Sequence, residues 1–272
     1  MNKAAWRAFS AARDQYREWT ETLRRSLPGL GALQQELINR RDGPGYPVET
    51  PVVYNGALDD VGPGDEIKLI LVADNPGRRE QAAENRRYLV GPSGKIAEKF
   101  FRDHPELDID FRKNVVILNK TPIHTPRTAD LRELCRLGDA AQGAAQKAAQ
   151  KAAQKGGSAF SVRVAESQEY MARLLPEFHR ALAPAPVWIT GYSEMKRGGI
   201  FEPYTETLRR LYGPEPAAGP RSARPCGELF FFRHFSMNQF TIDLRQQAAP
   251  GEALRETLDR VGRAYRQRIL GF

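Results

Sequence analysis

The stretch Lys68-Leu69-Ile70-Leu71-Val72-Ala73-Asp74-Asn75-Pro76-Gly77 decides the fold expected for this 272-residue chain. It starts with a short, continuous apolar run and ends in turn residues, which is typical of a strand buried on both faces. Similar runs occupy 114–118, 186–190 and 229–232. Helical patterns separate and follow these runs, at 94–104, 128–137, 164–182, 201–212 and 252–270. Buried strands that alternate with helices predict an α/β fold, a three-layer α/β/α sandwich around a central four-stranded parallel sheet.

The segments outside this alternation are predicted to be peripheral. Residues 3–41 have the pattern of two amphipathic helices broken at Pro28-Gly29, which would form an N-terminal helical layer over 1–45. Segment 138–158 contains a repeated Ala-Ala-Gln-Lys tetrad with no apolar residue larger than Ala, so we expect a solvated insertion, helical or frayed. A loop at 213–227 with four prolines is also expected outside the core. Together the elements predict a single domain over residues 1–272.

The composition excludes several classes of protein. No apolar run reaches about 18 residues, which rules out a membrane-spanning chain and leaves no reason to expect a membrane partner. Residues 1–25 carry charges throughout, so no secretion signal is expected. Two cysteines, Cys135 and Cys226, are too few for a disulfide scaffold or a four-cysteine cluster, and a cytoplasmic location is expected. The 41 Lys and Arg against 33 Asp and Glu leave a charge of +8, which favours a polyanionic partner, nucleic acid first.

Polar residues follow each of the four predicted strands. In an open parallel sheet, ligands bind beyond the carboxyl ends of the strands, where the loops diverge. An Asp, two Asn and a His are therefore expected to converge on one crevice. The segments concerned are Asp74-Asn75-Pro76-Gly77, Asn119-Lys120-Thr121-Pro122, Gly191-Tyr192-Ser193 and Arg233-His234-Phe235-Ser236.

Taken in order, these segments resemble the motifs of the uracil-DNA glycosylase superfamily. Residues 74–80 and 87–94 are similar to the first motif, and to the Pro-Phe-Val-Gly-x-x-Gly stretch after it, of the thermophile-type iron–sulfur branch. Residues 119–122 resemble that branch's Asn-x-x-Lys-Cys-Arg-Pro-Pro segment, and His234-Phe235-Ser236 resembles the His-Pro-Ser or His-Pro-Ala motif. Asn75-Pro76-Gly77 instead matches the mismatch-specific and single-strand-selective branches. The resemblance covers about residues 67–240.

The resemblance implies a DNA glycosylase of base excision repair, which flips out a deaminated base and hydrolyses its N-glycosidic bond. Asn75 would orient the attacking water through its carbonyl oxygen, and Asp74 is a second candidate for that role. His234 would donate a hydrogen bond to the pyrimidine carbonyl where the negative charge of the leaving base develops.

Three further residues are expected to bind the base. The carboxamide of Asn119 can pair with a ring N–H and its neighbouring carbonyl, which favours uracil, although hypoxanthine and xanthine present a similar edge. Tyr88 offers a face for stacking, with a buried core tyrosine as the alternative. Gly77 stands where the best-known branch has a Tyr, so the pocket would lack the ring that excludes a 5-substituent.

Contacts with single-stranded or duplex DNA are predicted at the residues Ser93, Gly94, Lys120, Arg127, Ser236 and Met237. Ser93 and Gly94 begin a predicted helix and would offer backbone N–H groups to a phosphate. Met237, or alternatively Phe240, could fill the gap left by a flipped base. Windows 74–95, 119–128, 190–199 and 230–240 hold ten Lys and Arg against four Asp and Glu, a net +6 of the total +8. This clustering predicts a phosphate backbone around the base pocket and binding that weakens as salt rises.

No metal or cofactor is expected, and the protein is expected to be a monomer. Thr121 stands where the iron–sulfur branch has a cluster cysteine, and two cysteines cannot ligate such a cluster. Cys135 and Cys226 are instead expected to be buried as small apolar side chains. The motifs show no obvious lysine nucleophile, so no Schiff-base lyase step is expected, and Lys120, the only lysine in the strand-end motifs, is interpreted as backbone or phosphate support.

Two other functions stay open on the sequence. The first is a superfamily member that binds nucleic acid with weak or no catalysis, because the first motif lacks the Asp that activates water in the best-known branch. The second is a serine hydrolase that uses Ser193, because Gly191-Tyr192-Ser193-Glu194-Met195 nearly spells the Gly-x-Ser-x-Gly nucleophile elbow.

Overall fold

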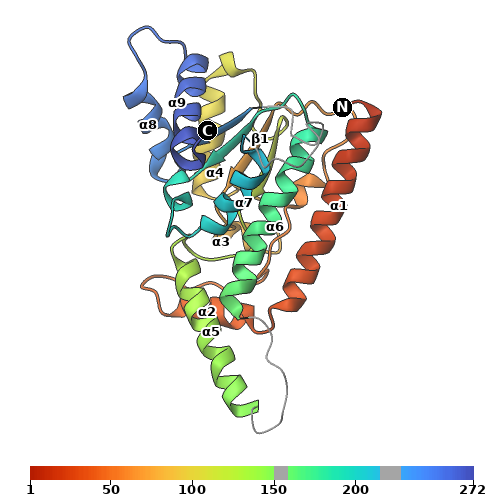
Figure 1. The fold of residues 1–272 in the computed structure, drawn as a ribbon, viewed down its shortest axis with the longest axis vertical. Helices are drawn as coiled ribbons and strands as arrows, with labels where there is room; N and C mark the ends of the chain where they lie inside the picture. The colour runs from red at the N-terminus through yellow and green to blue at the C-terminus, as the bar shows by residue number, and fades with distance from the viewer. Residues whose placement is uncertain (150–158, 215–227) are drawn as a thin grey trace.

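A parallel four-stranded sheet forms the centre of the molecule, with the strand order β2-β1-β3-β4. The computed structural model describes residues 1–149, 159–214 and 228–272 (Figure 1). The strands are β1 (Leu69–Ala73), β2 (Val115–Asn119), β3 (Val187–Thr190) and β4 (Leu229–Phe232). Each lies within one residue of its predicted run, because a strand covered on both faces must be apolar along its whole length. The predicted α/β three-layer fold is confirmed.

The register of the sheet brings the carboxyl ends of its strands to one edge. Ala73 of β1 pairs with Asn119 of β2, and Thr190 of β3 pairs with Phe232 of β4. All three pairings are parallel, so the four segments that follow the strands leave the sheet on the same side. This edge is where the sequence placed its polar residues.

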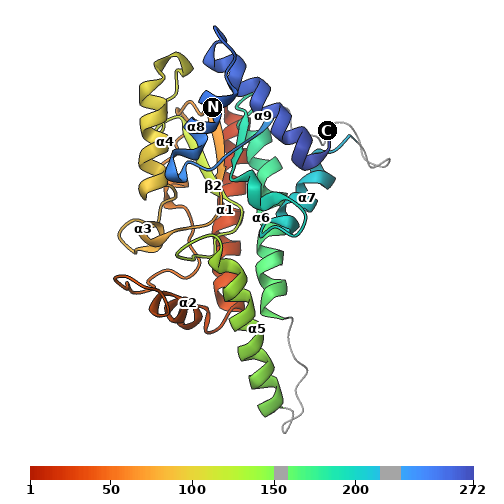
Figure 2. The same cartoon turned by 90° about the vertical axis from the view of Figure 1, so that its left-hand side faces the viewer.

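Helices cover both faces of the sheet (Figures 1 and 2). Ile70 and Val72 pack in a core cluster with α1 (Lys3–Ser26) and α6 (Phe160–Ala181). Leu69 and Leu71 point to the opposite face and pack with α4 and α9. Alternate residues of β1 therefore fill separate cores, as the two-residue period of a strand requires. The remaining helices are α2 (Leu30–Asn39), α3 (Arg78–Gln81), α4 (Pro92–Asp103), α5 (Asp130–Ala149), α7 (Glu202–Tyr212), α8 (Gln239–Gln247) and α9 (Leu254–Leu270).

The N-terminal layer consists of α1 and α2, with the break where the sequence predicted it. Gly29 precedes α2 with φ of 80°, a left-handed conformation that glycine adopts without a steric penalty. On α1, Phe9 and Tyr16 are buried, and Trp19 stacks on Tyr170 of α6 with ring centroids 3.7 Å apart. Aromatic contacts thus fasten this layer to the helix that covers the sheet.

Several boundaries differ from the sequence prediction. Helix α5 continues through Gly138 as far as Ala149, so this part of the predicted insertion adopts the helical alternative, because the Ala, Gln and Lys of the repeat are strong helix formers. Two segments lie outside the described residues. They are 150–158, which is the rest of the predicted insertion, and 215–227, which is most of the predicted loop and includes Cys226. Helices α3 and α8 were not predicted. No helix in the described part of the chain combines the length and the apolar character needed to cross a bilayer.

Candidate functional site

A cavity of about 740 Å³ opens at the carboxyl edge of the sheet. All four strand ends contribute to its wall. Asp74 and Asn75 follow β1, Asn119 ends β2, Gly191 follows β3 and His234 follows β4. The structure therefore brings together the Asp, the two Asn and the His that the strand-end rule selected.

The carboxamide nitrogen of Asn119 is buried without a partner. The residue is 1% exposed, and its Nδ2 makes no hydrogen bond with any residue that the structure describes. Leaving a buried donor unpaired costs about 1–3 kcal/mol, so such groups usually bond to protein, to an ordered water or to a ligand. Asn119 lines the cavity, and a ligand there would provide the missing contact.

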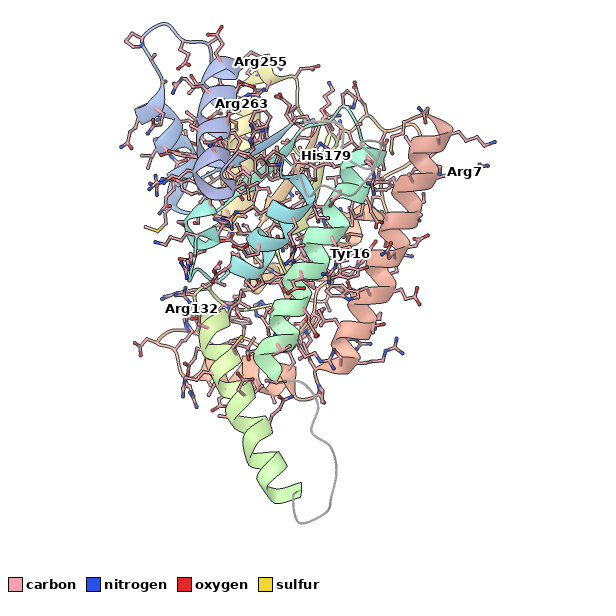
Figure 3. All side chains as sticks on the ribbon, viewed as in Figure 1. Arg7, Tyr16, Arg132, His179, Arg255 and Arg263 are labelled. Atoms are coloured by element: carbon pink, nitrogen blue, oxygen red, sulfur yellow. The ribbon has the colours of Figure 1, made fainter. Side chains whose placement is uncertain are left out.

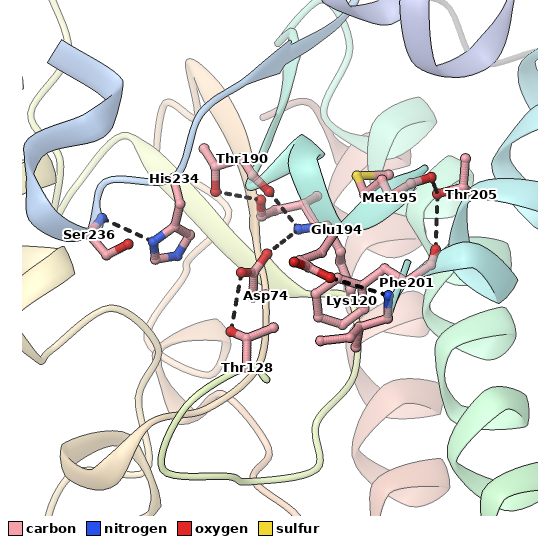
Figure 4. Close-up of polar contacts among 12 residues, drawn as sticks. Asp74, Lys120, Thr128, Thr190, Glu194, Met195, Phe201, Thr205, His234 and Ser236 are labelled. Atoms are coloured by element: carbon pink, nitrogen blue, oxygen red, sulfur yellow. Dashed lines mark hydrogen bonds and ion pairs between the residues drawn. The ribbon is translucent and has the colours of Figure 1, made fainter. Parts of the chain in front are cut away.

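Asp74 lies in a buried ion pair (Figure 4). Lys120 Nζ is 2.6 Å from Asp74 Oδ1 and 2.5 Å from the carbonyl oxygen of Thr190. The Thr128 hydroxyl donates to Asp74 Oδ2 at 3.2 Å. Burial lowers the pKa of Lys120, and the Asp74 carboxylate raises it. Both oxygens of Asp74 are thus engaged, which leaves this carboxylate poorly placed to act as a free base.

The prediction that Lys120 contacts DNA is corrected by this pair. Its side chain has 0% exposure, and its ammonium lies 4.8 Å from the centre of the Phe201 ring. A phosphate cannot reach a group enclosed in this way. The local sequence could not reveal this, because the partners of Lys120 come from two other strands.

Gly191 has to be glycine in this arrangement. Its φ is 76°, and a Cβ atom at this position would overlap the carboxylate of Asp74. Any larger residue would displace the Asp74–Lys120 pair or strain the backbone. The close approach explains why a glycine follows β3.

Asn75 has a fixed orientation. Its Nδ2 donates to the hydroxyl of Thr125 at 2.8 Å, and that hydroxyl donates to the carbonyl of Arg127 at 2.8 Å. Within the described residues Oδ1 of Asn75 accepts no hydrogen bond, and the side chain lines the cavity. Asn75 can therefore hold a water molecule through Oδ1.

The backbone fixes the tautomer of His234. The N–H of Ser236 donates to His234 Nδ1 at 3.0 Å, so Nδ1 must be unprotonated and the neutral ring carries its hydrogen on Nε2. Figure 4 shows the imidazole between Ser236 and Asp74 in this view. Burial lowers the pKa of His234, Asp74 acts in the opposite direction, and Lys120 lowers it further. At neutral pH the ring is a neutral donor at the cavity wall.

Tyr88 does not lie at the cavity, and its predicted stacking role is corrected. The ring is 1% exposed, and its hydroxyl lies 2.5 Å from that of Tyr16 and donates to the carbonyl of Val53 at 2.6 Å. Burial raises the pKa of Tyr88 well above its ordinary value. Among the described residues that line the cavity, none is a Phe, Tyr or Trp. The alternative of a core tyrosine is the one that the structure adopts.

The predicted DNA contact at Gly94 is also corrected. The other two predicted contacts of this kind, Ser93 and Ser236, line the cavity. Gly94 is buried at the start of α4, and a Cβ there would overlap the carbonyl of Leu89. Its role is close packing of the helix on the preceding loop. Gly77 lines the cavity with nothing within 4 Å of a Cβ, so the space beside it is open.

Of the two predicted wedge residues, only Met237 is exposed. Its side chain is 82% exposed, with φ of 53°, and it lines the cavity. Phe240 is 1% exposed, and its ring stacks on that of Phe235 with centroids 4.3 Å apart. The wedge prediction for Phe240 is therefore wrong, because the ring belongs to the core.

Exposed arginines line the mouth of the cavity. Arg127 was predicted as a contact, whereas Arg78 and Arg79 were counted only in the charge windows. The guanidinium of Arg78 lies 4.8 Å from the centre of the Tyr46 ring. Positive charge also occurs on α1 and α9, as Figure 3 shows for the labelled arginines Arg7, Arg255 and Arg263. The cavity is therefore distinguished by its three exposed arginines, Arg78, Arg79 and Arg127, and not by the total charge of the protein.

Ser193 is exposed and lines the cavity, but a nucleophile elbow is not assembled around it. No hydrogen bond joins it to His234 within the described residues, and His234 Nδ1 already accepts from Ser236. A serine hydrolase needs that base beside the hydroxyl. The geometry therefore gives the hydrolase alternative no support.

Neither the protein-family models nor the curated proteins compared with this chain match it. In the described ranges, no three His, Cys, Asp or Glu side chains gather in a way that could hold a metal ion. Cys135 is partly buried, and burial raises the pKa of its thiol to about 11. The groups available for chemistry are the side chains at the four strand ends.

Proposed function

We propose that this protein is a DNA glycosylase that flips out a deaminated base, with uracil favoured, and hydrolyses its N-glycosidic bond. The observation that carries the proposal is the unpartnered carboxamide of Asn119 in the cavity wall. Its oxygen can accept from N3–H of uracil while its N–H donates to the adjacent O4. Cytosine lacks that N3–H, whereas hypoxanthine and xanthine present a similar edge.

His234 would stabilise the leaving base. As the bond between C1′ and the base nitrogen breaks, its electron pair passes to the base and negative charge develops on the pyrimidine O2. A neutral Nε2–H, held in place through Nδ1 by Ser236, is a preorganised donor for that oxygen. The role needs no proton transfer from the ring.

Asn75 would position the water. Its Oδ1 can accept a hydrogen bond from a water molecule, because Thr125 fixes the other end of the carboxamide. The water oxygen bonds to C1′, and its proton passes to the departing base or to solvent, which completes the hydrolysis. An amide orients water without acting as a strong base, so we expect a slow enzyme.

DNA would lie across the mouth of the cavity. Arg78, Arg79 and Arg127, which line the cavity, would contact phosphates, and the exposed Met237 would enter the space left by the flipped base. The proposal includes action in base excision repair in the cytoplasm, as a monomer that uses neither metal nor cofactor.

The experiment that tests the proposal uses a single-stranded oligonucleotide with one uracil, incubated with excess protein and then treated with alkali. We expect strand cleavage at the uracil, lost in His234→Ala and kept in Arg7→Ala, a control on the exposed side of α1. A panel with hypoxanthine and xanthine in place of uracil identifies the preferred base. Absence of cleavage with every base, at enzyme excess, would contradict the proposal.

A nucleic-acid-binding protein without catalysis is the second candidate. It is favoured by the state of Asp74, whose two oxygens are engaged by Lys120 and Thr128 and do not activate water. The same assay separates the two candidates. Binding of the uracil oligonucleotide that depends on Asn119, with no cleavage at enzyme excess, would identify the binder.

A further inference from the structure

Glu80 is a buried carboxylate that accepts hydrogen bonds from two separate loops. It lies on α3, is 7% exposed and lines the cavity. Its Oε2 accepts from the N–H of Gly77 at 2.9 Å, and its Oε1 accepts from the N–H of Leu89 at 2.7 Å. No Lys, Arg or His of the described chain forms an ion pair with it. Burial raises the pKa of Glu80 to about 7, while backbone donors, Gly77 and Leu89 among them, act against the rise.

The two loops form one side of the cavity. The first, after β1, ends at Gly77 and leads into α3, which carries Arg78 and Arg79, and the second, residues 89–91, leads into α4. Leu89 has φ of 52°, a left-handed conformation that a branched residue keeps only where its surroundings hold it. Its N–H bonds to Glu80, and its carbonyl accepts from Arg112 at 3.1 Å. The conformation of the second loop therefore depends on contacts outside the loop.

We propose that Glu80 is a positioning residue that joins these loops and thereby holds the DNA-contacting wall of the cavity in shape. This inference rests on the proposed function. Asn119 and His234, two of the groups assigned to chemistry, stand at other strand ends, and no hydrogen bond of the described residues joins their side chains to either loop. Asn75 precedes Gly77 by two residues, and its carboxamide is held by Thr125. Glu80 should accordingly control how tightly the oligonucleotide binds and leave the rate of the bound complex nearly unchanged.

The geometry explains why a carboxylate is needed. Each of its oxygens accepts from a backbone N–H, and a backbone donor cannot turn away. In Glu80→Gln one of the two oxygens becomes an NH₂ group, which cannot accept a hydrogen bond from the backbone N–H that it faces. One of the two loops must therefore lose its hydrogen bond to residue 80. Glu80→Asp keeps both acceptors on a side chain that is one methylene shorter, and we expect it to restore part of the effect.

The test measures single-turnover excision of uracil against protein concentration for wild type, Glu80→Gln, Glu80→Asp and Glu84→Gln. Glu84 is an exposed neighbour whose one described partner is Asn85, so its variant is the matched control. We expect the half-saturating concentration to rise about tenfold or more in Glu80→Gln, with a maximal rate within about threefold of wild type. A fall in maximal rate with an unchanged half-saturating concentration would overturn the proposal.

Amide hydrogen exchange provides a second readout that does not depend on activity. The Gly77 and Leu89 amides should lose protection in Glu80→Gln and keep it in Glu84→Gln, while the β1 amides stay protected in both. Unchanged protection at Leu89 contradicts the proposal, and loss of protection across the sheet would show that Glu80 serves overall folding instead. If wild type excises no base, the proposed function fails, whereas exchange and the dissociation constant for a single-stranded oligonucleotide still test the role of Glu80.

Discussion

The ammonium of Lys120 lies 2.6 Å from Oδ1 of Asp74, and both residues are buried at the carboxyl edge of the sheet. Asp74 directly follows β1 and Lys120 directly follows β2, which are neighbouring strands. Lys120 also donates to the carbonyl of Thr190 on β3. One side chain thus connects three strand ends, and its partner Asp74 lines the cavity.

Lys120→Met should destabilise the protein strongly. The substitution keeps most of the volume but leaves the carboxylate of Asp74 buried without its cation, which typically costs about 3–5 kcal/mol. Urea unfolding at pH 7 measures the loss. Glu21→Gln, which breaks the exposed pair with Arg24, should cost less than about 1 kcal/mol. An equal effect of the two substitutions would show that the buried pair contributes little.

Asn119→Leu should abolish excision without destabilising the chain. Because Nδ2 of Asn119 has no partner to lose, an apolar side chain of similar size should leave the free energy of unfolding unchanged or raise it by about 1 kcal/mol. Urea unfolding and the alkali-cleavage assay give the two readouts. A large loss of stability would indicate that the carboxamide serves the fold.

The excision rate at saturating protein, which does not depend on Glu80, should stay constant as pH falls from 8 to about 6.5 and decrease only at lower pH. Burial lowers the pKa of His234, so the ring gains a proton only below the ordinary histidine range. That proton must enter at Nδ1, where it displaces the Ser236 N–H and disturbs the ring orientation. Single-turnover rates across this pH range check the prediction, and a decrease that begins above pH 7 would contradict it.

His124 should make the fold sensitive to acid. Its Nδ1 lies 2.8 Å from the carbonyl of Pro76, and burial lowers its pKa to about 4. The unfolded chain then binds more protons than the folded chain between about pH 6.5 and 4, so stability falls as pH falls, by up to about 3 kcal/mol. Urea unfolding at pH 7 and pH 4 should show a smaller decrease for His124→Gln than for wild type. The pKa of His179 is also lowered to about 4, but His179 is present in both proteins and contributes equally to their pH dependence.

Oligonucleotide binding should depend on salt through the arginines at the cavity mouth. A lost phosphate contact reduces the slope of log K against log salt by about 0.7 for a single strand. We expect that reduction for Arg79→Ala and for Arg127→Ala, and none for Arg7→Ala on α1. Fluorescence anisotropy between 50 and 200 mM salt, the range over which such contacts weaken measurably, provides the slopes. Identical slopes in all three variants would place the DNA elsewhere.

The strands were predictable because burial on both faces leaves a local signature, a continuous apolar run that ends at a turn. Helix ends were less predictable. The pattern at 128–137 gave no reason to extend α5 to Ala149, since the repeat has no apolar stripe and continues the helix through propensity alone. The four residues of α3 are too few to show a helical period.

The sequence by itself determined the parallel sheet, its four strands, and the convergence of Asp74, Asn75, Asn119 and His234, because parallel strands deliver their carboxyl ends to one edge. Only the tertiary structure decided what each side chain does there. Tyr88 bonds to Tyr16, 72 residues away, and so joins the core instead of the cavity. Lys120 meets Asp74 across 46 residues, and Met237 is exposed where Phe240 is not. Such partners come from distant parts of the chain, and local periodicity carries no record of them.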